Sequence, residues 1–299
     1  SFRKARMIYA YGFSIPGFYH LSDNSVCQDA HCIREIKPDL AVAAVADGLG
    51  SCEHSEIGSS LAVNISTEFC ETNYREEMSD DEILGVIKDA FEAAYESCKQ
   101  SAAEKDFPIE SYDTTLDLVI YRAGQIYYGH SGDSGLIALT ADGLFQPITE
   151  QQRDEMGYVF PLSFGKDYWK FGKVEKPVAS VMLMTDGMLD TLFPFDIRER
   201  PPYIHVALAR FFMDLSALKI TVEGESQTQN RIYEFVANID KDIVYDDKTV
   251  AVLLDSEVVA VPQPDEYYKE PDWARIKEEY HEKLRRIAYP HKSEEVEKT

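Results

Sequence analysis

The clearest pattern in the first third of the chain is an uninterrupted run of Leu, Ala and Val between Asp39 and Ala46. A short, continuous apolar run of this kind predicts a buried strand. Apolar residues then recur every three or four positions over 57–69 and 83–98, which predicts two amphipathic helices. Ser79 and Glu82, just before the second run, have the spacing of a capping box and predict where that helix begins.

Short strand patterns with turn residues between them occupy the centre of the chain. The predicted strands are 115–121, 125–129, 136–140, 144–148, 178–185 and 249–255. Because tight turns separate the first four, we expect them to form one antiparallel meander. The aromatic-rich stretch 151–177 is expected to be an irregular loop or flap, and helical patterns cover 203–215 and 229–238.

This order of elements predicts the fold class and the domain organisation. Two helices, a series of strands and then more helices favour an α+β fold of antiparallel sheets covered by helices. Pro262 and Pro264 mark a boundary, so we divide the chain into a main domain, 1–259, and a C-terminal tail, 260–299, with one amphipathic helix. We expect this helix to dock on the main domain, with a partner-binding or regulatory helix as the alternative.

Composition and charge narrow the functional classes. The chain of 299 residues carries 53 acidic and 30 basic residues, a formal charge of −23. A field of that sign repels phosphate backbones and anionic lipids, so we expect no binding to nucleic acid and none to membranes. No apolar stretch approaches the ~20 residues of a membrane-spanning helix. The five cysteines contain no Cys-x-x-Cys pair, and the expected location is the reducing cytoplasm.

Acidic residues stand at the ends of three predicted strands. Asp47-Gly48 and Asp186-Gly187 each end an apolar strand, and Asp246-Asp247 precedes the last strand. Asp142-Gly143 instead lies between two strands, where a hairpin turn favours this dipeptide. If the strands are neighbours, the carboxylates converge, and such carboxylates retain protons unless a cation lies among them. Mg²⁺ and Mn²⁺ favour oxygen ligands, so the pattern predicts a divalent-metal site.

Six motifs occur together in the order and spacing of one known family. They are Cys27-Gln28-Asp29-Ala30, Val45-Ala46-Asp47-Gly48-Leu49-Gly50-Ser51, Asp113-Thr114-Thr115, Gly129-His130-Ser131-Gly132-Asp133-Ser134, Met184-Thr185-Asp186-Gly187 and Asp246-Asp247-Lys248-Thr249. Over roughly residues 10–255 the chain resembles the metal-dependent protein serine/threonine phosphatases of the PPM, or type 2C, family, and its bacterial branch in particular. The resemblance implies that the main domain is catalytic and forms a four-layer α-β-β-α sandwich of two antiparallel sheets flanked by helices.

The resemblance also implies which residues bind metal. Asp47 would bridge two Mn²⁺ or Mg²⁺ ions. Asp186 and Asp246 would complete the protein ligands of the first ion, and the carbonyl of Gly48 would bind the second. Asp133, together with Asp186, matches a position that binds a third, weaker metal ion in related bacterial enzymes.

The same resemblance implies the reaction. Two dications lower the pKa of a shared water, and the metal-bridging hydroxide attacks the phosphorus of phosphoserine or phosphothreonine directly, without a phosphoenzyme. Asp29 would hold a metal-bound water. The residues that would carry the reaction are Asp29, Asp47, Asp186 and Asp246. The expected substrate is a phosphorylated protein, with a serine/threonine kinase as the partner enzyme.

Three positions depart from the family pattern. Gln28 stands where a glutamate is usual, which would weaken the second metal site; Asn24 replaces a phosphate-binding arginine, and Leu49 replaces a histidine that serves some members as an acid. The candidates for the phosphate contact are His20, Arg34 and Lys37. His130 has either a packing and hydrogen-bonding role or an acid role. The departures favour, as alternative, a pseudophosphatase that binds phosphoproteins or regulates a partner; a metal-dependent phosphodiesterase is a further possibility.

Overall fold

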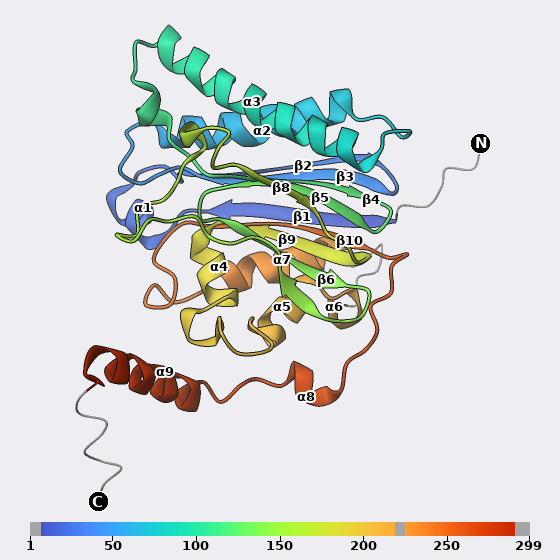
Figure 1. The fold of residues 1–299 in the computed structure, drawn as a ribbon, viewed down its shortest axis with the longest axis vertical. Helices are drawn as coiled ribbons and strands as arrows, with labels where there is room; N and C mark the ends of the chain where they lie inside the picture. Colours follow the sequence, from blue (N-terminus) through green and yellow to red (C-terminus); the bar gives the residue numbers. More distant parts are fainter. Residues whose placement is uncertain (1–6, 219–224, 291–299) are drawn as a thin grey trace, which may run out of the picture.

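The computed structural model describes residues 7–218 and 225–290 and contains two five-stranded antiparallel sheets packed face to face between helices (Figure 1). Along one sheet the strands are β1 (Ile8–Ile15), β10 (Lys248–Asp255), β9 (Val178–Met184), β6 (Gly135–Thr140) and β7 (Phe145–Pro147). Along the other they are β2 (Asp29–Lys37), β3 (Leu40–Asp47), β4 (Leu116–Arg122), β5 (Gln125–Ser131) and β8 (Lys170–Lys173). The predicted four-layer sandwich is confirmed.

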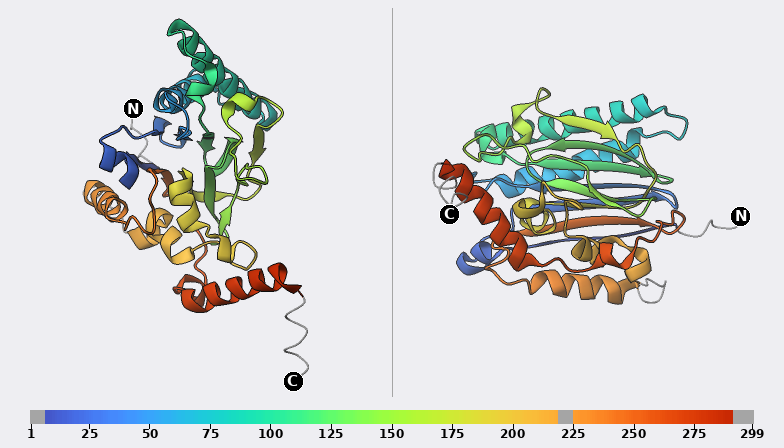
Figure 2. Two further views of the ribbon diagram at one scale, coloured as in Figure 1. Left: turned by 90° about the vertical axis from the view of Figure 1, so that its left-hand side faces the viewer. Right: turned by 60° about the horizontal axis from the view of Figure 1, so that its bottom comes forward.

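Each sheet has its own cover of helices (Figures 1 and 2). The β2–β8 sheet packs against α2 (Ser55–Asn73) and α3 (Asp80–Glu104). The capping box predicted at the start of α3 is present, because Ser79 and Glu82 each bond the other's backbone N–H. The β1–β7 sheet is covered by α4 (Asp186–Leu192), α5 (Val206–Met213), α6 (Leu215–Leu218) and α7 (Glu225–Ala237). Shorter elements are α1 (Phe18–Asp23) and the 3₁₀ helices η1 (Ile109–Tyr112), η2 (Leu162–Phe164) and η3 (Phe195–Ile197).

The continuous apolar run of β3 follows from its position in the sandwich. Val42 and Ala44 pack under α2 and α3, whereas Ala43 and Val45 pack against the opposite sheet. A strand that is covered on both faces has no solvent side, so its sequence does not alternate. This strand brings Asp47, its last residue, to one end of the sandwich.

The predicted meander is wrong at its centre. β4 and β5 pair with each other in one sheet, but residues 132–134 carry the chain into the other sheet, where β6 pairs with β7 and β9. The free edge of β5 is taken by β8, which lies inside the stretch expected to be irregular. Asp142-Gly143 forms the β6–β7 turn, as predicted. The crossing leaves Asp133 at the same end of the sandwich as Asp47.

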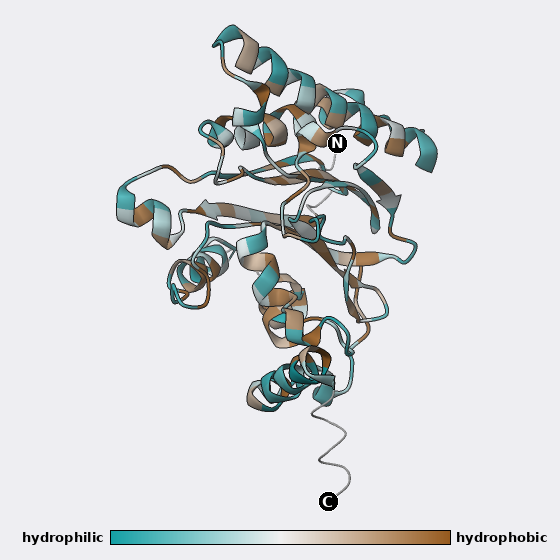
Figure 3. Ribbon diagram, turned by 60° about the vertical axis from the view of Figure 1, so that its left-hand side comes forward, coloured by the Kyte–Doolittle hydropathy of each residue, from teal (hydrophilic) through white to brown (hydrophobic). Residues whose placement is uncertain are grey.

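The tail forms a short helix α8 (Asp265–Tyr268) and the longer α9 (Trp273–Ala288). α8 rests on α5, where the Arg210 guanidinium lies 4.1 Å from the Tyr268 ring. α9 contacts η3, buries Ile276 and pairs Glu279 with Arg200 at 2.5 Å, and Figure 3 shows that most of its length is hydrophilic. The division of the chain at 259/260 stays a prediction. Of the helices in residues 7–218 and 225–290, none has the length and apolar character needed to span a membrane.

Candidate metal centre

Three aspartates from distant parts of the chain meet at one end of the sandwich. Asp47 ends β3, Asp133 lies at the crossing between β5 and β6, and Asp186 begins α4 directly after β9. One carboxylate oxygen of each lies within 4.8 Å of the other two. The structure thus brings together three of the residues predicted to bind metal.

The backbone around Asp47 is fixed by neighbours on both sides. Asp29 is its partner across the β2–β3 ladder, and the buried Asp29 carboxylate accepts a 2.7 Å hydrogen bond from the hydroxyl of Thr185, the residue before Asp186. The Asp47 N–H donates to Thr115 Oγ1 at 2.9 Å, and its carbonyl accepts from the Thr115 N–H. Two of the six motifs therefore serve to hold Asp47 and Asp186 in place.

The glycines that follow Asp47 and Asp186 permit close backbone packing at the site. A Cβ on Gly48 would lie 2.6 Å from the carbonyl oxygen of Ser55, and a Cβ on Gly187 would lie 2.2 Å from that of Asp247. Both distances are shorter than a van der Waals contact, so any larger residue would push these backbone segments apart. The two Asp-Gly dipeptides are thus explained by close approach at strand ends.

Asp246 and Asp247 precede β10 and have different environments. Asp246 is exposed and accepts from the Asp247 N–H at 2.8 Å; it lies outside the group of three aspartates. Asp247 is buried, and its carboxylate accepts hydrogen bonds from Gly17 N–H (2.7 Å), His20 Nδ1–H (2.7 Å) and Gln28 N–H (2.8 Å). It joins three segments around the site. The acidic pair is visible in the sequence, but the hydrogen bonds of Asp247 are not, because they join it to segments far away in the chain.

Burial raises the pKa of the Asp47 and Asp186 carboxyl groups. For Asp47 burial is the main cause, followed by the charges of Asp29 and Asp186. Burial also raises the pKa of Asp186, to about 7, and its Oδ1 is buried without a hydrogen-bond partner in the described part of the chain. A divalent cation would both neutralise this cluster and give Asp186 Oδ1 a partner. The oxygen donors therefore fit Mg²⁺ or Mn²⁺.

Arg153 supplies positive charge to the cluster. Its Nε donates to Asp133 Oδ2 at 2.8 Å, and its Nη2 donates to Asp186 Oδ2 at 3.0 Å. It comes from the stretch that was expected to be a loop or flap. No motif contains Arg153, and the one sequence signal for it is the general need of buried carboxylates for a cation.

Two of the three candidates for the phosphate contact lie far from the centre. Arg34 and Lys37 form ion pairs with glutamates elsewhere. They follow Asp29 along β2 by five and eight residues, or roughly 17 and 26 Å at ~3.3 Å per residue. The third candidate, His20, lies beside the site.

His130 is buried at the crossing between the sheets. Its Nδ1 lies 2.7 Å from Asp117 Oδ1, and its Nε2 lies 2.7 Å from the Glu150 carbonyl oxygen. Because both ring nitrogens are engaged, this geometry supports the hydrogen-bonding role of His130 over the acid role.

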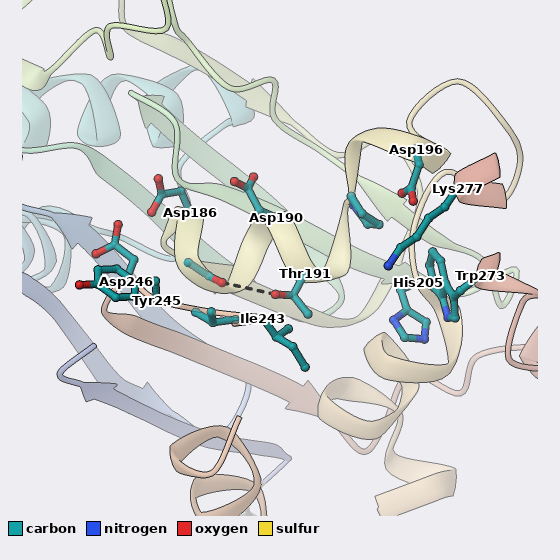
Figure 4. Close-up of a pocket in the computed structure, with 13 residues that line it drawn as sticks. Asp186, Asp190, Thr191, Asp196, His205, Ile243, Tyr245, Asp246, Trp273 and Lys277 are labelled. Carbon is teal, nitrogen blue, oxygen red and sulfur yellow. Dashed lines mark hydrogen bonds between the residues drawn. The ribbon is translucent and has the colours of Figure 1, made fainter. Parts of the chain in front are cut away.

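Two cavities open on either side of Asp246. The first, of about 510 Å³, has Asp186 and Asp246 at one end and Trp273 and Lys277 of α9 at the other (Figure 4). The second, of about 560 Å³, is lined by Asp246 and His20. Asp246 therefore lines both cavities, and Asp186 lines the first.

A family model described as protein phosphatase 2C matches residues 16–225, which is more than half of the chain. The chain belongs to the protein phosphatase 2C family. A search of curated proteins finds no match for this family member.

Solved serine/threonine phosphatases share the fold of this phosphatase 2C chain. PstP/Ppp of Mycobacterium tuberculosis has a TM-score of 0.56 and 14% identity, over 85% of this chain and 100% of that one. Stp1 of Staphylococcus aureus has a TM-score of 0.54 and 12% identity, over 85% and 97%. The PstP catalytic domain in complex with two manganese ions has a TM-score of 0.54 and 15% identity, over 83% and 98%. At such identities the likeness concerns the fold alone.

Proposed function

We propose that this protein is a Mg²⁺- or Mn²⁺-dependent phosphatase that hydrolyses phosphoserine and phosphothreonine in proteins. The observation that carries the proposal is the convergence of Asp47, Asp133 and Asp186 at one end of the sandwich. Membership of the protein phosphatase 2C family supports the reaction class.

The proposed ligands follow the family positions. Asp47 would hold two ions, with Asp186 and Asp246 on the first and the carbonyl of Gly48 on the second; Asp133 and Asp186 would hold a third, weaker one. The two manganese ions of the PstP catalytic domain support a pair of ions. When bound, such ions supply an activated water nucleophile and neutralise charge on the phosphoryl oxygens.

The residues of the chain would place the reactants. Asp29, fixed by the Thr185 hydroxyl, would orient the attacking water beside Asp47. The Asp186 carboxylate that accepts a hydrogen bond from Arg153 would also bind an incoming metal ion. The guanidinium and the metal ion would therefore compete for it. The cavity between Asp186 and α9 would receive the polypeptide on one side of the phosphorylated residue. We propose a serine/threonine kinase as the enzyme that phosphorylates the substrate, and the cytoplasm as the location.

The direct test is hydrolysis of p-nitrophenyl phosphate and of a panel of phosphoserine and phosphothreonine peptides, with EDTA, Mg²⁺ or Mn²⁺. We expect metal-dependent turnover that Asp47→Asn lowers by about 100-fold or more. Asp142→Asn is a matched control, because Asp142 lies in the β6–β7 turn and pairs with Lys176 at 2.6 Å; it should keep full activity. Wild-type protein that stays inert with both metals on every substrate would favour the pseudophosphatase. Faster turnover of a phosphodiester would favour a phosphodiesterase.

A further inference from the structure

We infer that His20 contacts the phosphoryl group of the substrate and that Asp247 holds it in position to do so. The inference rests on the proposed function and assigns the contact for which Asn24 lacks the usual arginine. His20 lies on α1, and its imidazole is turned inward, with 8% of the residue exposed.

Asp247 fixes the orientation of the imidazole. Asp247 Oδ1 lies 2.7 Å from His20 Nδ1, and the same carboxylate also accepts the backbone N–H groups of Gly17 and Gln28. Because a carboxylate accepts hydrogen bonds, Nδ1 is the nitrogen that carries the proton in this contact. Nε2 is then the ring nitrogen available to a ligand, because the side-chain hydrogen bond that His20 makes within residues 7–218 and 225–290 uses Nδ1.

The imidazole lines the cavity on the α1 side of Asp246. Of the described residues that line this cavity, His20 is the one that can carry a positive charge, while the charged neighbours are acidic. A phosphate dianion that enters such a cavity needs a hydrogen-bond donor there. An imidazolium donates from both nitrogens, so it can bond Asp247 through Nδ1 and a phosphoryl oxygen through Nε2.

Arg153 and the two other predicted candidates for the phosphate contact are less suited to it. Arg153 lies on Asp133 and Asp186, and its guanidinium is already shared between these two carboxylates. Arg34 and Lys37 point to other partners at the far end of β2. His20 combines a fixed orientation with a free nitrogen.

The test compares His20→Asn with His20→Gln. The asparagine amide can replace Nδ1 and keep the hydrogen bond to Asp247, whereas the longer glutamine amide can reach the position of Nε2. The measurements are binding of inorganic phosphate to the Mn²⁺-loaded full chain by calorimetry, KM for p-nitrophenyl phosphate, and Mn²⁺ affinity. We expect His20→Asn to weaken phosphate binding and raise KM by about tenfold or more, with Mn²⁺ affinity unchanged. His20→Gln should recover part of the loss, and His281→Asn, on the exposed face of α9, should change nothing.

Each other outcome has a definite meaning. If His20→Asn lowers Mn²⁺ affinity and leaves phosphate binding intact, His20 only supports the loop before β10 and the inference is wrong. It is also wrong if Arg153→Gln, and not His20→Asn, abolishes phosphate binding. Wild-type turnover with no effect of His20→Asn would overturn the contact but leave the proposed function standing. Phosphate binding that depends on His20, without hydrolysis of any ester, would support the contact but overturn the proposed function.

Discussion

Replacing Asp186 by asparagine should make the metal-free protein more stable at neutral pH. Burial, aided by the charges of Asp133 and Asp246, raises the pKa of Asp186 to about 7, whereas an unfolded aspartate titrates near ~3.9. Between these pH values the unfolded state has lost a proton that the folded state still binds. The stability of the metal-free protein therefore falls as pH rises through this window. Asparagine does not titrate and removes that loss.

The size of the effect follows from the shift. The folded and unfolded pKa of Asp186 differ by about three units. Above pH 7 this difference lowers the free energy of unfolding by about 4 kcal/mol, at 1.36 kcal/mol per unit. The Asp186 side chain is 19% exposed, so solvent screens it little. The folded-state pKa already contains the attraction of Arg153 for the ionised carboxylate, so losing this ion pair takes nothing further from the gain. The gain is about 4 kcal/mol at pH 8, or roughly 8–16 °C in Tm, and it should vanish below about pH 4.

The assay is unfolding in EDTA from pH 4 to pH 8 for both proteins. The curves should meet at pH 4 and diverge as pH rises, and added Mn²⁺ should stabilise the wild type more than Asp186→Asn. Asp142→Asn serves as a control of opposite sign, because its hydrogen bond with Lys176 lowers the pKa of Asp142 and its removal costs stability above the normal aspartate pKa. Parallel curves for wild type and Asp186→Asn would refute the reasoning.

Two further substitutions test the surroundings of the cluster. Arg153→Gln removes the cation from Asp133 and Asp186, so the metal-free protein should lose about 1–2 kcal/mol of stability at pH 8. Because no guanidinium then competes for Asp186, calorimetry should show tighter Mn²⁺ binding. An unchanged Mn²⁺ affinity would contradict this. Gln28→Glu adds a carboxylate to the lining of the His20 cavity, so half-maximal hydrolysis should need less Mn²⁺. An identical Mn²⁺ titration would place residue 28 outside the reach of the second ion.

Local patterns predicted those parts of the fold in which one segment determines its own structure. The unbroken apolar run of β3 indicates burial on both faces of the strand, and the Ser79 capping box indicates where α3 begins. β1 and β2 were not predicted: they are edge strands, and the polar positions of β2, such as His31 and Arg34, weaken its alternation. The crossing after β5 was missed because β5 pairs with β8, some 40 residues further along the chain, and not with β6, which follows it directly.

The same distinction between local patterns and long-range contacts applies to the candidate site. The aspartates at strand ends and their family motifs are visible in the sequence, because a glycine follows Asp47 and Asp186 and marks the end of each strand pattern. Arg153 and the role of Asp247 were not visible, since both depend on contacts between segments far apart in the chain. The site-residue roles themselves stay predictions until a metal-loaded protein is assayed.

Because α9 forms the far wall of the cavity that begins at Asp186 and Asp246, the proposed function would draw the walls of its substrate path and its metal ligands from separate stretches of the polypeptide. Changes in the tail can reshape the entrance for incoming proteins while every carboxylate keeps its place. A chain shortened before Trp273 would retain the aspartates but lose the wall that Trp273 and Lys277 contribute to this cavity.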